Sequence, residues 1–432
     1  MVGKRVNVIT LGCSKNLVDT ERVLKLFVDA GFNAQHEAEH IDGDIVVINT
    51  CGFIGDAKEE SVETILKYIE AKKNGLISAI YVMGCLSERY RNELTIEIPE
   101  VDGWYGKFDW PKLVSDITTK VTKSVKYDRV ITTPSHHAYL KIAEGCNRFC
   151  SFCAIPLITG RYTSRPIEEI IDEVVMLVSR GVKEFNIIAQ DLSSYGLDIY
   201  GAMKLPALID AIADIDGVEW IRLHYAYPAQ FPMELLDVMA RRKNVCKYLD
   251  IALQHINDTV LKNMRRNITG TETRELIAEM RRRIPGLHIR TTLMVGFPGE
   301  GEAEFEELLE FVKEQRFERM GAFAYCEEDD TYGAKKFKDK ISNDIKQKRL
   351  SKLMAIQEEI ALASNESKIG ETLRVIIDRE ETDYYIGRTQ WDSPEVDPEV
   401  LVEKEMLLKI GEFYNVFIKS AMPFEIIATP CL

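Results

Sequence analysis

The chain has 432 residues, of which 46% are hydrophobic and 29% are charged, and it carries a formal net charge of −14. This length exceeds one ordinary core and predicts two or three domains of a globular protein. The acidic balance disfavours a nucleic-acid partner, and the absence of a long apolar run or a signal-like start predicts a cytoplasmic protein without a membrane segment.

The first segment, residues 1–130, alternates short β-branched runs with helical patterns. This rhythm predicts an α/β domain in which a parallel sheet carries helices on both faces. Strands are expected at Val6–Leu11, Asp44–Thr50 and Ala79–Gly84, and helices at Val18–Ala30 and Asp56–Lys72.

One cysteine follows each of these strands: Cys13, Cys51 and Cys85, which we call the strand-end triad. The carboxyl ends of parallel strands lie at one edge of a sheet, where open α/β sheets bind their ligands. The intervals of 38 and 34 residues are each close to one βα unit, so the three thiols should converge. Three unrelated buried cysteines are the alternative. The repeated position favours a three-thiolate iron–sulfur site with one open iron.

A turn-rich stretch over 131–138 predicts a linker, with His136 and His137 at the surface. Residues 139–342 then contain six strand-like runs separated by helical patterns. They predict a partial (βα)6 barrel, and a doubly wound sheet is the competing topology. The runs are Tyr139–Glu144, Glu184–Gln190, Trp220–Tyr225, Tyr248–Gln254, His288–Val295 and Gly321–Tyr325, with helices expected at Pro166–Arg180, Pro232–Arg242 and Glu302–Gln315.

A second set of cysteines lies in one short loop, E-G-C-N-R-F-C-S-F-C-A-I-P, and comprises Cys146, Cys150 and Cys153, which we call the loop triad. Three thiolates within eight residues can hold three corners of a 4Fe-4S cube and leave the fourth iron free. Structural zinc usually takes four ligands in paired units, so this spacing fits zinc poorly. Chance clustering of thiols is the remaining alternative. A free iron would make the site chemical rather than structural.

The end of the chain changes character. A long charged helix is expected over 343–366, followed over 367–432 by a small five-strand barrel of the oligonucleotide-binding kind. Residues 368–432 contain thirteen acidic and seven basic side chains, a net charge of −6. Because RNA binding needs a positive groove, we do not expect this domain to bind RNA directly, whereas an acidic surface would attract a basic protein. An acidic surface kept for solubility is the alternative.

The C-x3-C-x2-C spacing, with Phe152 before the last cysteine, resembles that of the radical S-adenosylmethionine (radical SAM) enzymes. The three-part organisation resembles the methylthiotransferases of that class along the whole chain, including a final TRAM barrel. The resemblance implies that the loop triad holds the cluster that binds and cleaves S-adenosylmethionine. It implies that the strand-end triad holds an auxiliary cluster that delivers sulfur. Two 4Fe-4S clusters, two S-adenosylmethionine molecules per turnover, an external electron donor and a sulfur source follow from it.

Ten positions match elements that form the S-adenosylmethionine pocket in this family. They are expected to bind the cofactor on the strength of the resemblance alone, since glycine–proline turns are otherwise common. The positions are Phe152, Ser164, Arg165, Gln190, Asp191, Tyr195, Gly196, Gly296, Pro298 and Gly299.

The family divides by substrate into enzymes that modify adenosine in transfer RNA and enzymes that modify an aspartate of small-subunit ribosomal protein twelve. The strings at 190–196, 224–228, 253–255 and 392–397 resemble the second branch. That resemblance implies a methylthio group at the β-carbon of the aspartate, on the free protein or within the ribosomal subunit. Transfer RNA is the nearest alternative substrate, and a non-enzymatic iron–sulfur electron carrier or scaffold is a remote one.

The remaining cysteines have no partner at ligand spacing. Cys246 and Cys431 are expected to be core residues or bystanders, and Cys326, which follows the last barrel strand, is a weak candidate for a substrate contact. His224 and His255 are expected to shape the pocket rather than to act as catalytic bases.

Overall fold

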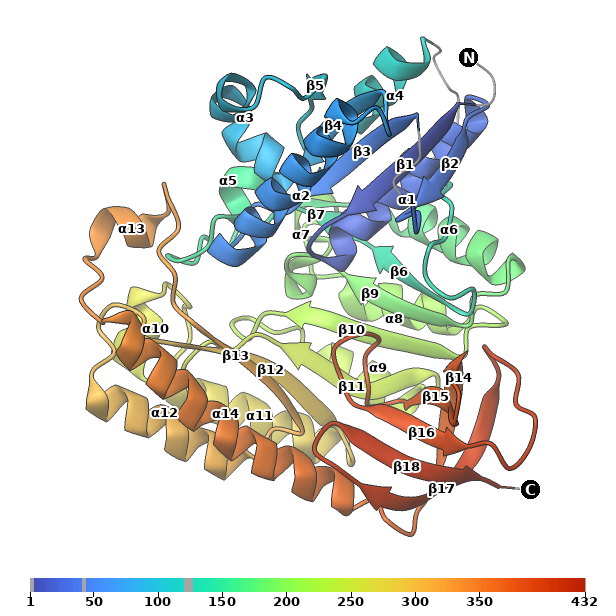
Figure 1. The fold of residues 1–432 in the computed structure, drawn as a ribbon. Coiled ribbons are helices and arrows are strands. Elements are labelled where there is room, and N and C mark those ends of the chain that lie inside the picture. The colour runs from blue at the N-terminus through green and yellow to red at the C-terminus, as the bar shows by residue number, and fades with distance from the viewer. Residues whose placement is uncertain (1–3, 41–43, 120–126, 432) are drawn as a thin grey trace. The chain divides into compact units, whose positions relative to one another are not determined.

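The computed structural model describes residues 4–40, 44–119 and 127–431, which form two compact units (Figure 1). Unit 1 contains the amino-terminal residues to 133 together with 139–147 and 153–162. Unit 2 contains 134–138, 148–152 and the chain from 163 onward. The segment that carries the loop triad therefore contributes to both units.

Unit 1 is built on a five-stranded parallel sheet in the order β2-β1-β3-β4-β5. The predicted strands and helices of this segment are confirmed, but two short edge strands were not predicted. The strands are β1 (Arg5–Thr10), β2 (Asn33–His36), β3 (Ile45–Thr50), β4 (Ala79–Gly84) and β5 (Gly103–Trp104). The helices are α1 (Ser14–Asp29), α2 (Gly55–Lys73), α3 (Cys85–Glu97), α4 (Trp110–Thr118) and α5 (Ile155–Thr159).

Alternate side chains of these strands enter two separate cores, because successive residues of a strand point to opposite faces. Val6 and Val8 pack in a core with residues of α1 and α4, such as Phe27. Val46 and Ile48 pack in a second core with residues of α2 and α3. The sheet is thus covered on both faces, as the near-continuous apolar strands require.

A six-stranded sheet, most of which belongs to unit 2, has the order β13-β12-β11-β10-β9-β6, which follows the chain without reversal. A doubly wound sheet would reverse its order at a switch point, so the partial-barrel prediction is confirmed over the alternative. The strands are β6 (His137–Lys141), β9 (Glu184–Ile188), β10 (Trp220–Ala226), β11 (Val245–Ile251), β12 (His288–Val295) and β13 (Arg319–Ala324), and two-residue strands lie at β7 (Ala143–Glu144) and β8 (Thr163–Ser164).

Helices of unit 2 follow or connect the strands. The predicted helices at 166–180, 232–242, 302–315 and 343–366 are confirmed within a few residues. The helices are α6 (Ile167–Ser179), η1 (Leu192–Ser194), α7 (Leu197–Tyr200), α8 (Leu205–Ala213), α9 (Glu234–Arg241), α10 (Asp258–Asn263), α11 (Gly270–Arg283), α12 (Glu302–Gln315), α13 (Tyr332–Lys336) and α14 (Asn343–Glu366).

The carboxy-terminal strands close into the predicted five-strand barrel, in the order β14-β15-β16-β18-β17. Its interior is filled by alternating apolar side chains such as Val375, Val402 and Ile426. The strands are β14 (Thr372–Glu380), β15 (Tyr384–Thr389), β16 (Glu399–Glu403), β17 (Phe413–Ala421) and β18 (Glu425–Pro430).

This barrel contacts the six-stranded sheet through buried ion pairs. The Glu184 carboxylate of β9 lies 2.7 Å from the Arg388 guanidinium of β15 and 3.1 Å from that of Arg222. Burial acts to raise the pKa of Glu184, but the two arginines outweigh it and lower the pKa to about 2. The carboxylate is therefore held ionised inside the protein.

The prediction that His136 and His137 lie at the surface is wrong. Both side chains are buried, because His137 begins β6 and the His136 ring bonds Asp378 of β14 at 2.7 Å. The prediction for Cys246 as a core residue is confirmed, since it packs with Trp220 and Tyr248.

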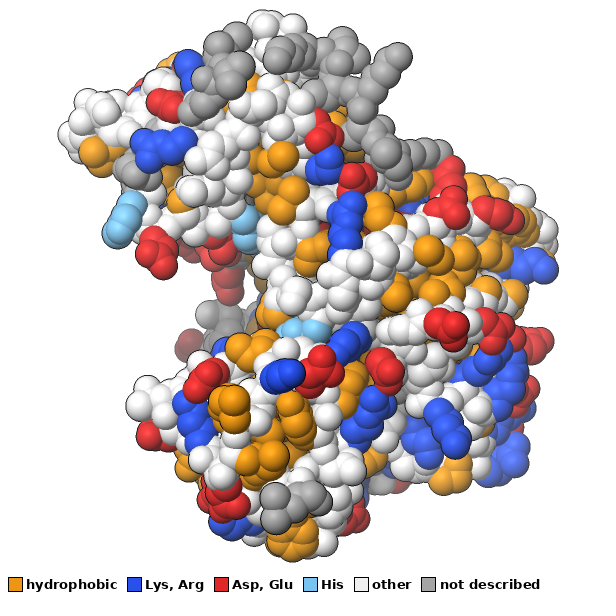
Figure 2. Space-filling view, turned by 90° about the vertical axis from the view of Figure 1, so that its right-hand side faces the viewer, with side chains coloured by type: hydrophobic (Ala, Val, Ile, Leu, Met, Phe, Trp, Pro, Cys, Tyr) orange, Lys and Arg blue, Asp and Glu red, His pale blue; other side chains and the backbone are white. Residues whose placement is uncertain are grey.

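The described residues include no helix that is both long enough and apolar enough to cross a membrane. On the face shown in Figure 2, acidic and basic side chains neighbour one another and alternate with apolar ones.

Candidate functional site

The three cysteines of the strand-end triad occupy equivalent positions at the carboxyl edge of the unit 1 sheet. Cys13 lies between β1 and α1, Cys51 directly follows β3, and Cys85 directly follows β4 and begins α3. The strand order reverses between β1 and β3, which makes this edge the topological switch point where open α/β sheets bind ligands.

Three glycines allow the cysteine-bearing segments to approach one another. A Cβ on Gly12 would lie 2.7 Å from the Cβ and 2.8 Å from the sulfur of Cys51. A Cβ on Gly52 would lie 2.6 Å from the backbone nitrogen of Leu86, and one on Gly84 would lie 2.5 Å from the Thr50 carbonyl. The three segments are thus closer than any side chain at these positions would permit.

Asn16, on the first turn of α1, ties the same segments together. Its Nδ2 donates to the carbonyl oxygens of Leu11 (3.0 Å) and Thr50 (3.1 Å), after β1 and at the end of β3. Its Oδ1 accepts a contact from the Cys85 thiol at 3.6 Å. One buried amide therefore links all three segments of the triad.

The charges around the triad differ from one thiol to the next. Burial raises the pKa of Cys85 to about 12 against the opposing charge of Lys107, and the thiols of Cys13 and Cys51 raise it further. Atoms packed around Cys13 act to raise its pKa, but Lys15 and Lys107 outweigh them, so its pKa lies below the ordinary value. The three thiols are close enough to influence one another electrostatically.

A buried network of ion pairs lies next to the strand-end triad. The Lys107 ammonium lies 2.9 Å from the Asp19 carboxylate and 3.5 Å from Asn16 Oδ1, and Lys141 bonds the other oxygen of Asp19. Burial acts to raise the pKa of Asp19, but the two lysines outweigh it and hold the pKa well below its usual range. The ammonium of Lys107 therefore stays charged beside the thiols.

The donors of the strand-end triad suit an iron–sulfur cluster, because its ligands in proteins are cysteine thiolates. A 4Fe-4S cube spreads its cysteine ligands over separate corners, wider than the shell of one ion. The three thiols of the strand-end triad, with the Lys107 ammonium near them, therefore have the donor chemistry that a 4Fe-4S cluster requires.

The loop triad lies in the segment after β6 and β7, and its three cysteines are partly exposed. Within unit 1, the Cys146 amide donates to the Gly160 carbonyl at 3.3 Å. Within unit 2, Ser151 is fixed to the end of α10, since its amide bonds the Met264 carbonyl (3.0 Å) and its hydroxyl donates to the Asn263 carbonyl (2.7 Å). Both flanks of the loop are thus held by backbone contacts.

Cys150 has polar partners directed at its sulfur. Arg266 donates through Nη1 to Cys150 Sγ at 3.3 Å, and the Tyr227 hydroxyl lies 3.9 Å from the same sulfur. Arg148, two residues before Cys150, places its guanidinium 4.2 Å from the Tyr227 ring centre and its Nε 2.7 Å from Asp191. The guanidinium of Arg266 is the donor to this sulfur, and such a donor fits a thiolate that ligates a metal.

Of the expected cofactor-pocket positions, four form one hydrogen-bonded group. Ser164 Oγ accepts from the Gly196 amide at 2.9 Å and donates to Asp198 at 2.6 Å. The Tyr195 hydroxyl donates to the Arg165 carbonyl at 2.7 Å. The structure therefore brings 164–165 and 195–196 together, at the carboxyl side of β9.

The other expected positions follow the ends of β9 and β12. Gln190 and Asp191 lie two and three residues beyond the end of β9, and Asp191 accepts from the Ser193 amide at 2.9 Å. The turn that holds Gly296, Pro298 and Gly299 comes directly after β12. Phe152 packs edge-on against Phe297 of that turn, with ring centres 6.4 Å apart. All of these residues lie at the carboxyl edge of the sheet, where barrels of this type place their active sites.

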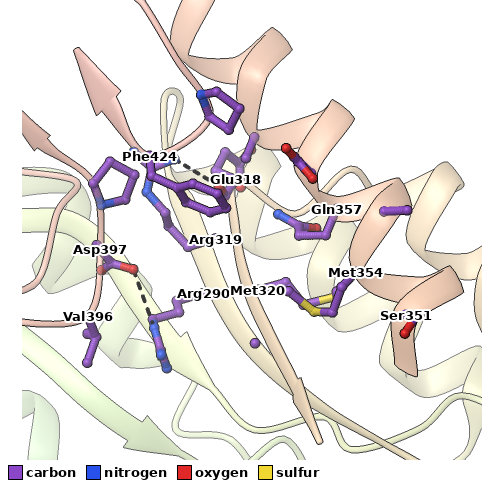
Figure 3. Close-up of a pocket in the computed structure, with 16 residues that line it drawn as sticks. Arg290, Glu318, Arg319, Met320, Ser351, Met354, Gln357, Val396, Asp397 and Phe424 are labelled. Carbon is purple, nitrogen blue, oxygen red and sulfur yellow. Dashed lines mark hydrogen bonds and ion pairs between the residues drawn. The ribbon is translucent and has the colours of Figure 1, made fainter. Parts of the chain in front are cut away.

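A cavity of about 360 Å³ lies elsewhere in unit 2 (Figure 3). Its walls include Arg290 and Arg319 near the amino ends of β12 and β13, Met354 and Gln357 of α14, and Phe424. The amino edge of a parallel barrel serves stability rather than catalysis. We therefore do not assign the chemistry to this cavity.

Several residues of both sites were not identified from the sequence: Asn16, Asp19 and Lys107 beside the strand-end triad, and Arg148, Tyr227 and Arg266 beside Cys150. Arg148 lies inside the cysteine loop, and Tyr227 lies in the string at 224–228, so both were near a recognised motif. No local pattern marks Lys107 or Arg266, which reach their sites from far along the chain.

Three family models match successive parts of the chain. Residues 5–106 match an uncharacterised protein family, UPF0004, residues 140–312 match the radical SAM superfamily, and residues 369–430 match the TRAM domain. The radical SAM match assigns an iron–sulfur cluster and S-adenosylmethionine to the chain.

Solved structures share the fold at low sequence identity. The radical S-adenosylmethionine methyltransferase TsrM from Kitasatospora setae superposes with a TM-score of 0.54 at 16% identity, covering 75% of each chain. The cobalamin-dependent radical enzyme OxsB superposes with a TM-score of 0.51 at 13% identity, covering 82% of this chain and 56% of that one. These likenesses support the fold alone.

Relatives with assigned names match the chain from end to end. The ribosomal protein uS12 methylthiotransferase RimO of Phocaeicola vulgatus is 59% identical over 425 residues, which cover 98% of each chain. The RimO proteins of Parabacteroides distasonis and Cytophaga hutchinsonii are 58% and 48% identical, and the matches cover 98% of this chain and 98% and 97% of theirs. With identities of 48% to 59% over 98% of its length, the chain belongs to the RimO family of radical SAM methylthiotransferases.

Proposed function

We propose that this protein attaches a methylthio group to ribosomal protein uS12, replacing one hydrogen on the β-carbon of an aspartate side chain. The observation that carries the proposal is the end-to-end identity of 59% to a relative named for this activity. The strand-end triad supports it independently, since a radical enzyme that only cleaves S-adenosylmethionine needs no second set of convergent thiols.

We assign the radical-generating 4Fe-4S cluster to Cys146, Cys150 and Cys153, and a second 4Fe-4S cluster to Cys13, Cys51 and Cys85. When bound, these groups and two molecules of S-adenosylmethionine supply a carbon-centred radical, a sulfur atom and a methyl group. The chain's residues hold and orient them. Asn16 fixes the segments of the strand-end triad, Arg266 and Tyr227 contact Cys150, and the ten pocket residues named above would bind S-adenosylmethionine.

The charge of the final barrel supports a protein substrate. Residues 368–432 carry a net charge of −6, and ribosomal proteins are basic, so attraction favours uS12 over RNA. We propose that the protein binds uS12 in the cytoplasm, either as the free protein or within the ribosomal subunit. We also propose that the carboxy-terminal barrel does not bind RNA directly. An external electron donor and a sulfur source complete the reaction.

Mass spectrometry of uS12 tests the proposal. In cells that carry this gene, one uS12 peptide should have the mass of an aspartate with a methylthio group in place of hydrogen. In cells without the gene, the increment should be absent and should return with a plasmid copy.

Two other results would overturn the substrate or the activity. If uS12 is unchanged while 2-methylthio groups disappear from transfer RNA, the substrate is transfer RNA. If the purified protein cycles between redox states but releases no 5′-deoxyadenosine from S-adenosylmethionine, the protein is an electron carrier or scaffold.

A further inference from the structure

The Arg266 side chain is held in one position beside Cys150. Its guanidinium is buried, and Nη1 lies 3.3 Å from Cys150 Sγ. Nη2 donates to the carbonyl of Ala252, just beyond β11. Because these two nitrogens bond to a sulfur and a carbonyl rather than to a carboxylate, the positive charge is directed at the sulfur.

Tyr227 prevents this side chain from turning away. The Arg266 guanidinium lies 4.0 Å from the centre of the Tyr227 ring, and the Arg148 guanidinium lies 4.2 Å from it. The Tyr227 hydroxyl donates to the Arg266 carbonyl at 2.7 Å, so the same tyrosine fixes both backbone and side chain. Stacking of guanidinium groups on a desolvated aromatic ring is favourable.

A hydrogen bond to a cluster sulfur has a defined electronic effect. Reduction adds one negative charge to the cluster, and donors or cations near its cysteine sulfurs stabilise the reduced form. Charge-assisted hydrogen bonds are about twice as strong as neutral ones, and their effect is greatest where water is excluded. A buried arginine that donates to one ligand sulfur should therefore make the cluster easier to reduce.

We propose that Arg266, stacked on Tyr227, is a positioning residue that raises the reduction potential of the cluster held by Cys150. The proposal deepens the proposed function and rests on its assignment of the loop triad. It assigns Arg266 a role in delivering the electron and none in binding uS12.

The test is a redox titration of Arg266→Met followed by electron paramagnetic resonance. Full-length protein with Cys13, Cys51 and Cys85 changed to alanine is reconstituted with iron and sulfide, so that only the loop-triad signal remains. Arg265→Met is the matched control, because this exposed neighbour carries the same charge but stacks on Tyr332 at 4.7 Å instead of contacting Cys150.

We expect Arg266→Met to lower the reduced-to-oxidised ratio at a fixed potential at least tenfold, a shift of about 59 mV for one electron. Arg265→Met should leave the ratio unchanged. If Arg266→Met, Arg265→Met and the parent protein have equal midpoint potentials, the proposal is overturned.

Two milder variants keep the test decisive if Arg266→Met does not fold or binds no iron. Arg266→Lys retains the charge and should lie between the parent and the methionine variant. Tyr227→Phe keeps the ring but loses the hydroxyl and should give a smaller shift. Parent-like potentials in both would overturn the proposal. A parent protein that binds no cluster at all would instead overturn the proposed function on which the inference rests.

Discussion

The two triads are assembled in opposite ways. The loop triad is local in sequence: its three cysteines fall within eight residues of one loop. The strand-end triad draws each cysteine from a different strand end, and it exists only once β1, β3 and β4 have paired. The residues around the loop triad should therefore set the reduction potential of its cluster. The strand-end triad depends on the folded sheet to bring its cysteines together.

The residues that surround the two triads differ in the same way. Beside the strand-end triad, three glycines and Asn16 permit and fix a close approach of separate segments. Beside Cys150, the notable contact is a donor to sulfur, Arg266. Changes to the glycines beside the strand-end triad should therefore remove a cluster, whereas changes to Arg266 should alter the properties of a cluster that still forms.

The largest expected effect separates the roles of the triads. Cys146→Ala should abolish cleavage of S-adenosylmethionine, because only two thiolates would remain for the radical cluster. Cys51→Ala should leave cleavage intact and stop methylthio transfer. Release of 5′-deoxyadenosine and the mass of uS12 measure the two activities. Loss of both activities in Cys51→Ala would contradict the division of labour.

The next effect tests assembly. Gly12→Ala would place a Cβ 2.7 Å from that of Cys51, at a φ of +89°. Gly31→Ala is the matched control, with a φ of +87° and no atom within 4 Å of the added Cβ. Both changes should cost about 1 kcal/mol of backbone strain. Only Gly12→Ala should also lose the strand-end cluster, measured as a fall from about eight to about four irons per chain. Equal iron in both variants would contradict the role of the close approach.

A third effect tests the ion network behind the strand-end triad. Lys107→Met leaves the buried Asp19 carboxylate with one lysine fewer, and we expect a loss of about 3 kcal/mol in the free energy of opening of unit 1. Hydrogen exchange of the β1 and β3 amides measures it. Lys73→Met, which removes a mostly exposed partner of Glu100, should cost less than about 1 kcal/mol.

The smallest expected effect is a change in the pH dependence of protein stability at Glu184, a residue of neither triad. The pKa of Glu184 is about 2 in the folded protein and about 4.3 when unfolded, so its stabilisation is present above pH 4.3 and is lost as pH falls toward 2. The slope is at most about 1.4 kcal/mol per pH unit. Acid unfolding of metal-free Glu184→Gln should lack this slope, while iron uptake at neutral pH stays unchanged.

Local patterns predicted most of the fold and both triads. Strong apolar runs predicted β1, β3 and β4, and cysteine spacing predicted the loop triad. The edge strands β2 and β5 were not predicted, because the β2 sequence N-A-Q-H has little apolar pattern and β5 (Gly103–Trp104) spans only two residues. They form by pairing with a neighbouring strand rather than by propensity.

Contacts that join distant parts of the chain could not be predicted from local patterns. Lys107 meets Asn16 across 91 residues, and Arg266 meets Cys150 across 116 residues. The linker histidines were misassigned for the same reason, since the partner of His136, Asp378, lies 242 residues away. Tertiary packing decides such contacts, and no spacing in the sequence records them.

Iron and acid-labile sulfide counts on anaerobically reconstituted protein test the central claim, that each triad holds its own 4Fe-4S cluster. We expect about eight irons for the parent chain and about four for both Cys51→Ala and Cys150→Ala. About four irons in the parent, unchanged by Cys51→Ala, would contradict it and leave the strand-end triad without a cluster.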